Sequence, residues 1–212
     1  MFVVQTFVNS PVTSNCYVLF DRDFGNDCIL VDPGSRSEKE LISYLDQEGM
    51  IPMYIILTHE HFDHCWGVNE LVEKYQVPII CSQLCAEAIK NEKRNCSVFY
   101  DNKDAFVINN EVINVEFIDF ELLFDAKKIR FFLTPGHTDA SISFIADKFI
   151  FTGDTLLKGI KTVTKLPTGS LAKLKKSLQM YSKLQDQNLM VLPGHGDPFQ
   201  LKGSELNNAN NI

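Results

Sequence analysis

Short apolar runs separated by polar turns dominate the chain, and each run has the length of a strand. They predict strands at residues 1–8, 12–20, 27–31, 54–57, 78–81, 105–108, 115–118, 129–133, 142–145, 149–151 and 191–192. Between them, apolar residues recur every three or four positions in longer segments. This spacing predicts helices at residues 37–48, 65–75, 82–90 and 170–185. Strands with flanking amphipathic helices indicate a mixed α/β protein.

Residues that are typical of helix ends support the predicted helix boundaries. Ser37 and Glu40 match a capping box at the start of the first helix, and Gly49 marks its end. Ser82 is suited to cap the third helix. The polar segment 91–104 predicts a long loop, a kind of segment that is often functional in a compact domain.

Composition narrows the class of protein. No linker or internal repeat divides the 212 residues, so a single domain 1–212 is expected. A net charge of −7 argues against a broad nucleic-acid surface. No apolar run approaches membrane-spanning length and no basic stretch precedes the first strand, so neither a membrane segment nor a signal peptide is expected. The six cysteines form no CxxC pair, which favours reduced thiols and a cytoplasmic location.

Three of the five histidines lie in one segment directly after a predicted strand, Thr58-His59-Glu60-His61-Phe62-Asp63-His64. Residues two apart in an extended segment point the same way, about 6–7 Å apart, so His59 and His61 can converge on one ion. Asp63 and His64 lie at the start of the next predicted helix and can bind a second ion. Imidazole nitrogen and carboxylate oxygen suit zinc, iron or manganese.

The other two histidines also stand at strand ends. His137 and His195 each follow a Pro-Gly pair after an apolar run. All five histidines therefore end strands, and none lies on a helix face. A polar loop with chance histidines is the simpler alternative, but this distribution favours a metal site.

These residues carry a family resemblance. The pattern His59-x-His61-x-Asp63-His64, followed in order by His137, Asp154 and His195, resembles the motif set of the metallo-β-lactamase-fold hydrolases. Within that family it is most similar to the short glyoxalase II-like (hydroxyacylglutathione hydrolase-like) branch. The resemblance runs from about residue 15 to about residue 208. It implies a four-layer αββα sandwich with the site along one edge of the sheets.

The resemblance also implies two divalent metal ions, with zinc favoured and iron or manganese as alternatives. The first ion would be held by three histidines: His59, His61 and His137. The second would be held by three further side chains: Asp63, His64 and His195. Asp154 would bridge the two ions, although a surface turn is the ordinary reading of a Gly-Asp pair after a strand. Asp32 and Thr58 would support the ligands from behind, with an Asx turn as the alternative for Asp32.

The reaction implied is hydrolysis of a thioester or ester by a metal-bridged hydroxide that Asp63 orients, which makes Asp63 the catalytic residue. A thiolate leaves readily because its parent thiol has a pKa near 8.5. An amine needs a proton donor, and the chain has no sixth histidine to serve as one. The expected partner is a small-molecule substrate, with no nucleic acid and no membrane. Neither the natural substrate nor the oligomeric state can be read from the sequence.

Two departures from the family pattern concern the substrate. The chain ends soon after His195, without the C-terminal helical region with which full-length glyoxalase II enzymes bind glutathione. Where the short branch has an Arg and an Asp before the last helix, this chain has Val163 and Lys165. The alternatives are a persulfide dioxygenase with one iron, a phosphodiesterase or nuclease of the same fold, a true β-lactamase, and a metal-stabilised binding module.

Overall fold

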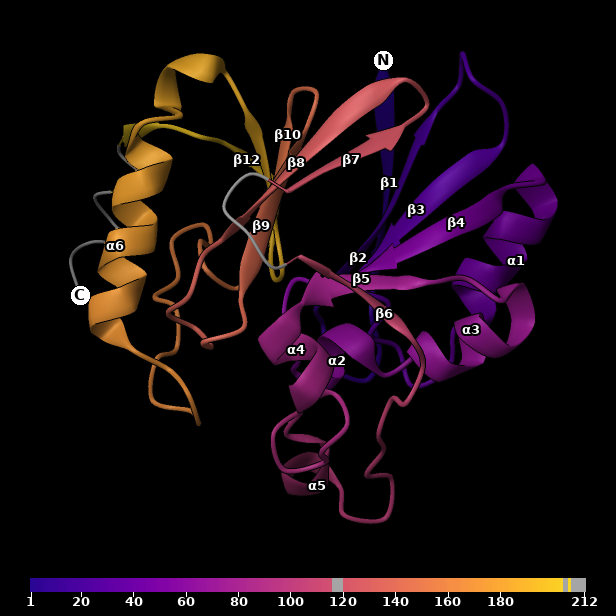
Figure 1. Cartoon of the computed structure of the whole chain (residues 1–212), viewed down its shortest axis with the longest axis horizontal. Helices are drawn as coiled ribbons and strands as arrows, with labels where there is room; N and C mark the ends of the chain where they lie inside the picture. The colour runs from indigo at the N-terminus through magenta and orange to yellow at the C-terminus, as the bar shows by residue number, and fades with distance from the viewer. Residues whose placement is uncertain (116–119, 204–205, 207–212) are drawn as a thin grey trace. The chain divides into compact units, whose positions relative to one another are not determined.

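The computed structural model describes residues 1–115, 120–203 and 206. The chain forms two compact units, residues 1–114 and 115–212, and each contains a six-stranded mixed sheet (Figure 1). The expectation of a single domain 1–212 stays a prediction. Within the described residues, no helix combines the length and apolarity needed to cross a lipid bilayer.

The first sheet has the strand order β1-β2-β3-β4-β5-β6. Its strands are β1 (Phe2–Val8), β2 (Asn15–Asp21), β3 (Asp27–Val31), β4 (Ile51–Ile56), β5 (Ile79–Ser82) and β6 (Val112–Val115). The first three run antiparallel, whereas β3, β4 and β5 are parallel. Parallel neighbours bring their carboxyl ends to one edge, and Val31 pairs there with Ile56. Residues that follow β3 and β4 are therefore neighbours in space.

Helices make the crossovers that parallel strands require. They are α1 (Lys39–Glu48), α2 (Phe62–Cys65) and α3 (Val68–Tyr75), while α4 (Gln83–Ala88) and α5 (Ser97–Tyr100) lie between β5 and β6 along the chain. α1 and α3 lie side by side (Figure 1), joined by an ion pair between Lys74 and Asp46. Both helices turn apolar side chains inward, including Leu45 and Leu71. The Ser82 hydroxyl accepts a hydrogen bond from the Cys85 N–H, which confirms the predicted cap of α4.

The second sheet has the order β12-β11-β10-β9-β8-β7. Its strands are β7 (Phe120–Phe124), β8 (Lys127–Leu133), β9 (Ile142–Ala146), β10 (Phe149–Gly153), β11 (Met190–Pro193) and β12 (Phe199–Gln200). α6 (Leu171–Ser182) and the 3-10 turn η1 (Gln185–Gln187) precede β11. α6 packs its buried Leu174, Leu178 and Tyr181 into a core with Ile150 and Val191 of the sheet. The Ser170 hydroxyl caps α6, at the position where the sequence places the start of the helix.

The structure corrects the predicted start of α1. Ser37 does not cap the helix, because Glu38 occupies the N-cap position. The Glu38 carboxylate is buried and accepts a hydrogen bond from the Ser35 N–H. It also lies against Gly67, where an added Cβ would come within 2.1 Å of a Glu38 oxygen. Of the helix predicted at 65–75, residues 68–75 form α3, whereas Cys65 is the last residue of the separate helix α2, and Gly67 lies between the two helices.

The strand predicted at 105–108 is wrong. The Asn95 and Ser97 side chains bind the backbone of Phe106, so that backbone is not available to a sheet. The predicted loop 91–104 contains the short helix α5. Of the strand predicted at 115–118, only its first residue falls in β6, and the others lie outside the described residues. β7 and β12 were not predicted.

Glu38 gives a testable pH dependence. Burial raises its pKa from 4.5 to about 8, the Ser35 N–H lowers it, and the neighbouring Glu70 raises it. Between these two values the folded chain retains a proton that the unfolded chain has lost, so the stability contributed by Glu38 falls as the pH rises through this window. We expect Glu38→Gln to weaken this fall, measured as urea midpoints at pH 5, 7 and 9. The exposed Glu40→Gln is the control, and identical pH profiles for Glu38→Gln and the wild type would contradict the assignment.

Candidate metal centre

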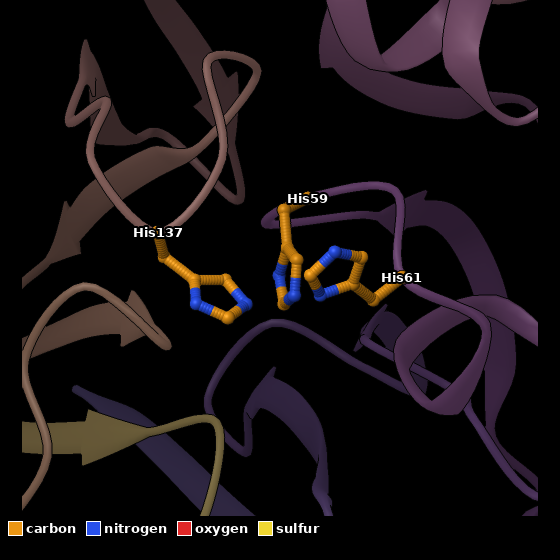
Figure 2. Close-up of side chains that lie close together, drawn as sticks. All are labelled: His59, His61 and His137. Carbon is orange, nitrogen blue, oxygen red and sulfur yellow. The ribbon is translucent and has the colours of Figure 1, made fainter. Parts of the chain in front are cut away.

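The segment after β4 carries the first histidine pair. His59 and His61 are buried, and their rings meet edge to face with centroids 4.8 Å apart. Figure 2 shows the rings of His59 and His61 side by side. A nitrogen of His59 and a nitrogen of His61 lie within 4.8 Å of each other. The convergence expected from residues two apart in an extended segment is therefore present.

α2 adds Asp63 and His64 to the same segment. The His64 ring is fully buried and its centroid lies 4.2 Å from that of His59. The Nε2 atom of His64 lies 3.7 Å from Asp63 Oδ2, and the Asp63 side chain keeps 13% of its surface exposed. The first unit thus gathers three imidazoles and one carboxylate, and Asp63 is the member that opens toward solvent.

Asp32 fixes the orientation of this group from behind. It follows β3, at the sheet edge that it shares with the end of β4. Its carboxylate accepts hydrogen bonds from the Thr58 N–H at 2.7 Å and from the Thr58 hydroxyl at 2.6 Å. It also lies 3.1 Å from His64 Nδ1. A carboxylate can only accept, so the His64 proton sits on Nδ1, and Nε2 presents a lone pair to Asp63.

Thr58 orients His59 in the same way. Its single hydroxyl proton goes to Asp32, so the oxygen accepts from His59 Nδ1 at 3.1 Å. The lone pair of His59 is then on Nε2. Asp32 and Thr58 make the contacts expected of groups that support metal ligands, and their role toward a metal stays a prediction.

Sequence reasoning missed the residues that hold the Asp63 backbone. The buried Ser14 hydroxyl donates to the Asp63 carbonyl, and Asn9 Nδ2 donates to Ser14 Oγ at 2.9 Å and to the Asp32 carbonyl at 3.0 Å. Gly34 also lies against this carbonyl, where an added Cβ would come within 1.7 Å of the oxygen. Ser14 is 49 positions from Asp63, so no local pattern could have shown the contact.

The second unit gathers three side chains at one sheet edge. β8, β10 and β11 run in the same direction, so their carboxyl ends meet. His137 follows β8, Asp154 follows β10 and His195 follows β11. Asp154 Oδ2 lies 3.6 Å from His137 Nε2 and 3.5 Å from His195 Nε2. One carboxylate oxygen therefore faces two imidazoles.

The loop after Asp154 sets the tautomer of His137. The Val163 carbonyl lies 2.8 Å from His137 Nδ1 and can only accept, so the proton is on Nδ1 and the lone pair is on Nε2. The Thr162 hydroxyl anchors this loop, because it donates a hydrogen bond to the Asp154 carbonyl at 2.8 Å. Gly136, before the histidine, packs against α6, where an added Cβ would come within 2.4 Å of Leu174 Cα.

The donor set fits divalent metal ions. In each unit a nitrogen lone pair faces a carboxylate oxygen at 3.6 to 3.7 Å, for His137 with Asp154 and for His64 with Asp63. This is too long for a hydrogen bond, and two acceptors repel unless a cation lies between them. Two ligands of one tetrahedral ion, each about 2.1 Å from it, stand about 3.4 Å apart. Cys65, which lies close by, directs its thiol to the carbonyls of Glu60 and His61 at 3.4 Å and 3.3 Å, and burial holds the pKa of this thiol well above the usual value.

A sequence model of the metallo-β-lactamase superfamily matches residues 9–195, which include all seven candidate ligands. The chain belongs to this superfamily. Its α/β fold is the metallo-β-lactamase fold, as the sequence predicts. A probable metallo-hydrolase of Bacillus subtilis, YqgX, is 29% identical over 195 residues, which cover 88% of this chain and 86% of YqgX.

Two solved structures of metallo-β-lactamase-fold proteins are similar to the chain over nearly its whole length. One is BLEG-1, described as a B3 metallo-β-lactamase, with a TM-score of 0.86 and 25% identity, covering 98% of this chain and 97% of BLEG-1. The other is TTHA1623 in a di-iron-bound form, with a TM-score of 0.79 and 26% identity, covering 93% of this chain and 95% of that one. Neither likeness identifies the glyoxalase II-like branch, which stays a prediction.

Proposed function

We propose that the chain is a binuclear metal-dependent hydrolase that cleaves thioesters or esters. The observation that carries the proposal is the pairing of a nitrogen lone pair with a carboxylate oxygen at 3.6 to 3.7 Å within each unit. The donors are seven: His59, His61, Asp63, His64, His137, Asp154 and His195. Seven donors exceed the four of a closed structural zinc site, and none is a cysteine. This supports two ions and a catalytic rather than a structural role.

The division of ligands is the one that the resemblance implies. His59, His61 and His137 would hold one ion, Asp63, His64 and His195 would hold the other, and Asp154 would be shared by both. Metal ions held there would polarise a substrate carbonyl and lower the pKa of water from 15.7 to about 7. Zinc is the ion that we favour, with iron as the first alternative because the similar TTHA1623 was solved in a di-iron-bound form.

Asp63 is the catalytic residue in this proposal. Its side chain is the partly exposed member of the ligand segment, and its backbone is held by Ser14 and by the close approach of Gly34. A carboxylate fixed in this way can accept a hydrogen bond from an attacking water molecule and set its direction. Asp32, which contacts His64 Nδ1, keeps the His64 ring in the tautomer whose lone pair is on Nε2 and faces Asp63.

The leaving group selects the substrate class. The candidate site contains no histidine beyond the five that are assigned to metal, so no further imidazole can protonate an amine. A thiolate departs without such a donor, because its parent thiol has a pKa near 8.5. Thioesters, and then esters, therefore fit better than peptides or β-lactams.

The proposal predicts both metal content and substrate range. Protein purified without added metal should contain close to two equivalents of metal by elemental analysis. It should hydrolyse S-lactoylglutathione and a matched lactoyl thioester without the tripeptide at similar kcat/KM, because Val163 and Lys165 replace the Arg and the Asp that are typical of the short glyoxalase II-like pattern. A glutathione preference above about a hundredfold, roughly 2.7 kcal/mol, would contradict the weak thiol discrimination.

Other outcomes of the same measurements identify the alternatives. One tightly held iron, with oxygen uptake on glutathione persulfide, would favour a persulfide dioxygenase. Faster hydrolysis of a cephalosporin than of any thioester would favour a β-lactamase, the description that the similar BLEG-1 carries. Phosphodiester cleavage would favour a nuclease, against which the net charge of −7 argues.

We also propose a reducing, cytoplasmic location. All six cysteines lie in residues 1–115 and are free thiols, and five of them are buried. Cys81 and Cys85, the one pair spaced like metal ligands on a helix, are packed into the core. Free thiols are typical of compartments that keep them reduced. Fractionation of cells that express the protein tests the location.

A further inference from the structure

An aromatic cluster lies next to the ligand segment of the first unit. α2 carries Phe62 between the ligands His61 and Asp63, and Trp66 follows one helical turn later. The Phe62 and Trp66 rings meet edge to face with centroids 5.4 Å apart. The Tyr100 ring, from α5, lies 4.8 Å from Phe62 and 5.7 Å from Trp66. The three rings form one continuous apolar surface that includes a residue of the ligand segment.

One side of this cluster is already covered. The Phe106 ring stacks on Trp66 with centroids 5.8 Å apart and an interplanar angle of 15°. The Arg36 guanidinium lies 5.9 Å from the Trp66 centroid and forms an ion pair with Asp104. The positive charge of Arg36 is therefore compensated. The cluster offers aromatic surface without a net charge of its own, which suits an uncharged aromatic group better than an anion.

Anchoring of the segment 91–108 does not account for the exposure of Tyr100 and the partial exposure of Phe62 and Trp66. Hydrogen bonds already anchor it, because the Phe62 N–H donates to the Asn95 carbonyl at 2.8 Å and Asn95 Nδ2 donates to the Phe106 carbonyl at 2.8 Å. A cluster that served only as a small core would bury its rings. Tyr100 instead keeps 49% of its surface exposed. Exposed aromatic surface that adjoins a site is typical of a binding surface.

The helix geometry relates the cluster to the ligands. Phe62 and Trp66 are four positions apart and share one face of the helical turn, whereas His64 is two positions away and points to the opposite, buried face. Asp63 lies between these faces and is partly exposed. Consecutive Cα atoms are 3.8 Å apart. Phe62 is the residue directly before Asp63, so a group of a substrate that is held at Asp63 lies within reach of the cluster.

We propose that Phe62, Trp66 and Tyr100 form a subsite for an aromatic acyl group, so that aryl-substituted thioesters such as phenylacetyl thioesters are preferred substrates. The subsite rests on the proposed function for the reaction that it serves. Offset and edge-to-face contacts between rings give such an acyl group a gain that a short alkyl acyl group cannot obtain.

The first test measures binding without turnover. Trp66 is the only tryptophan, so the emission of the protein reports on the subsite directly. Titration of the metal-loaded protein with phenylacetate should change the Trp66 emission in a saturable way. Acetate, which offers the same carboxylate to the metals, should not. Equal responses to the two anions, or no response to phenylacetate, would overturn the subsite.

The second test measures selectivity. The ratio of kcat/KM for a phenylacetyl thioester to that for the acetyl thioester of the same thiol should fall about tenfold in Tyr100→Ala, the size expected for loss of one aromatic contact. Tyr100→Phe keeps the ring and should keep the ratio, which separates stacking from the hydroxyl. The control is Phe24→Ala, at the turn between β2 and β3, where the ring is 53% exposed.

The two tests distinguish failure of the subsite from failure of the proposed function. A saturable response to phenylacetate in a protein that hydrolyses no thioester would keep the subsite and reject the thioesterase. Thioester hydrolysis with an unchanged acyl ratio in Tyr100→Ala would keep the thioesterase and reject the subsite.

Discussion

Asp154→Asn is expected to lose at least one bound metal ion and to lower kcat/KM by roughly 10³-fold or more, about 4 kcal/mol. One oxygen of this carboxylate lies 3.5 Å and 3.6 Å from the nitrogens of two histidines. Asparagine keeps the size of the side chain but removes the negative charge that offsets two dications. The residue follows β10 in a turn, so the fold should be retained.

The measurement is metal content by elemental analysis together with kcat/KM on a thioester. Asp186→Asn, an exposed carboxylate of η1 in the same unit, is the matched control and should change neither quantity. If Asp154→Asn retained both metals and full activity, Asp154 would have no place in the site, and the ordinary reading of a Gly-Asp turn would be correct.

Asp32→Ala is expected to weaken metal binding by about 10- to 100-fold, although Asp32 is not itself proposed as a ligand. The carboxylate accepts from the Thr58 backbone and hydroxyl and from His64. Alanine leaves these buried donors without their acceptor and frees His64 and Thr58 to turn. We also expect a loss of about 3 kcal/mol in the free energy of unfolding, because buried donors lose their partner.

Chelator competition measures the metal affinity, and urea unfolding of the metal-free protein measures the stability separately. Asp23→Ala, at the exposed turn before β3, is the control, since its ion pair with the amino terminus is exposed and contributes little. A variant that lost stability but kept the wild-type metal affinity would show that Asp32 supports the fold and not the ligands.

The grouping of the candidate ligands within each unit could be predicted from the sequence because its signals are local, while their role as ligands stays a prediction. His59 and His61 alternate along an extended segment, and His137 and His195 each follow Pro-Gly at the end of a strand. The resemblance supplied the roles of Asp154 and Asp32, which single Gly-Asp and Asp-Pro turns do not reveal. Most strands were predicted for a related reason, since a buried strand is a continuous apolar run.

The parts that were missed depend on contacts between distant positions. Glu38 replaced Ser37 at the start of α1 because the Ser35 N–H and the close approach of Gly67 favour its carboxylate there. The strand predicted at 105–108 has the right side chains, but Asn95 and Ser97 bind its backbone. The support that Ser14 gives to Asp63 spans 49 positions, beyond the reach of any periodic pattern.

The contact of Ser14 with Asp63 has a consequence for how the protein can be shortened. A chain that began at residue 15 would keep all seven ligand side chains and the whole matched motif set. It would lose Ser14, which donates to the Asp63 carbonyl, and Asn9, which donates to the Ser14 hydroxyl oxygen, and it would leave β2 as an open edge without its partner β1. The smallest fragment that carries every ligand is therefore not the smallest fragment that can act, and the turn before β2 belongs to the minimal functional unit.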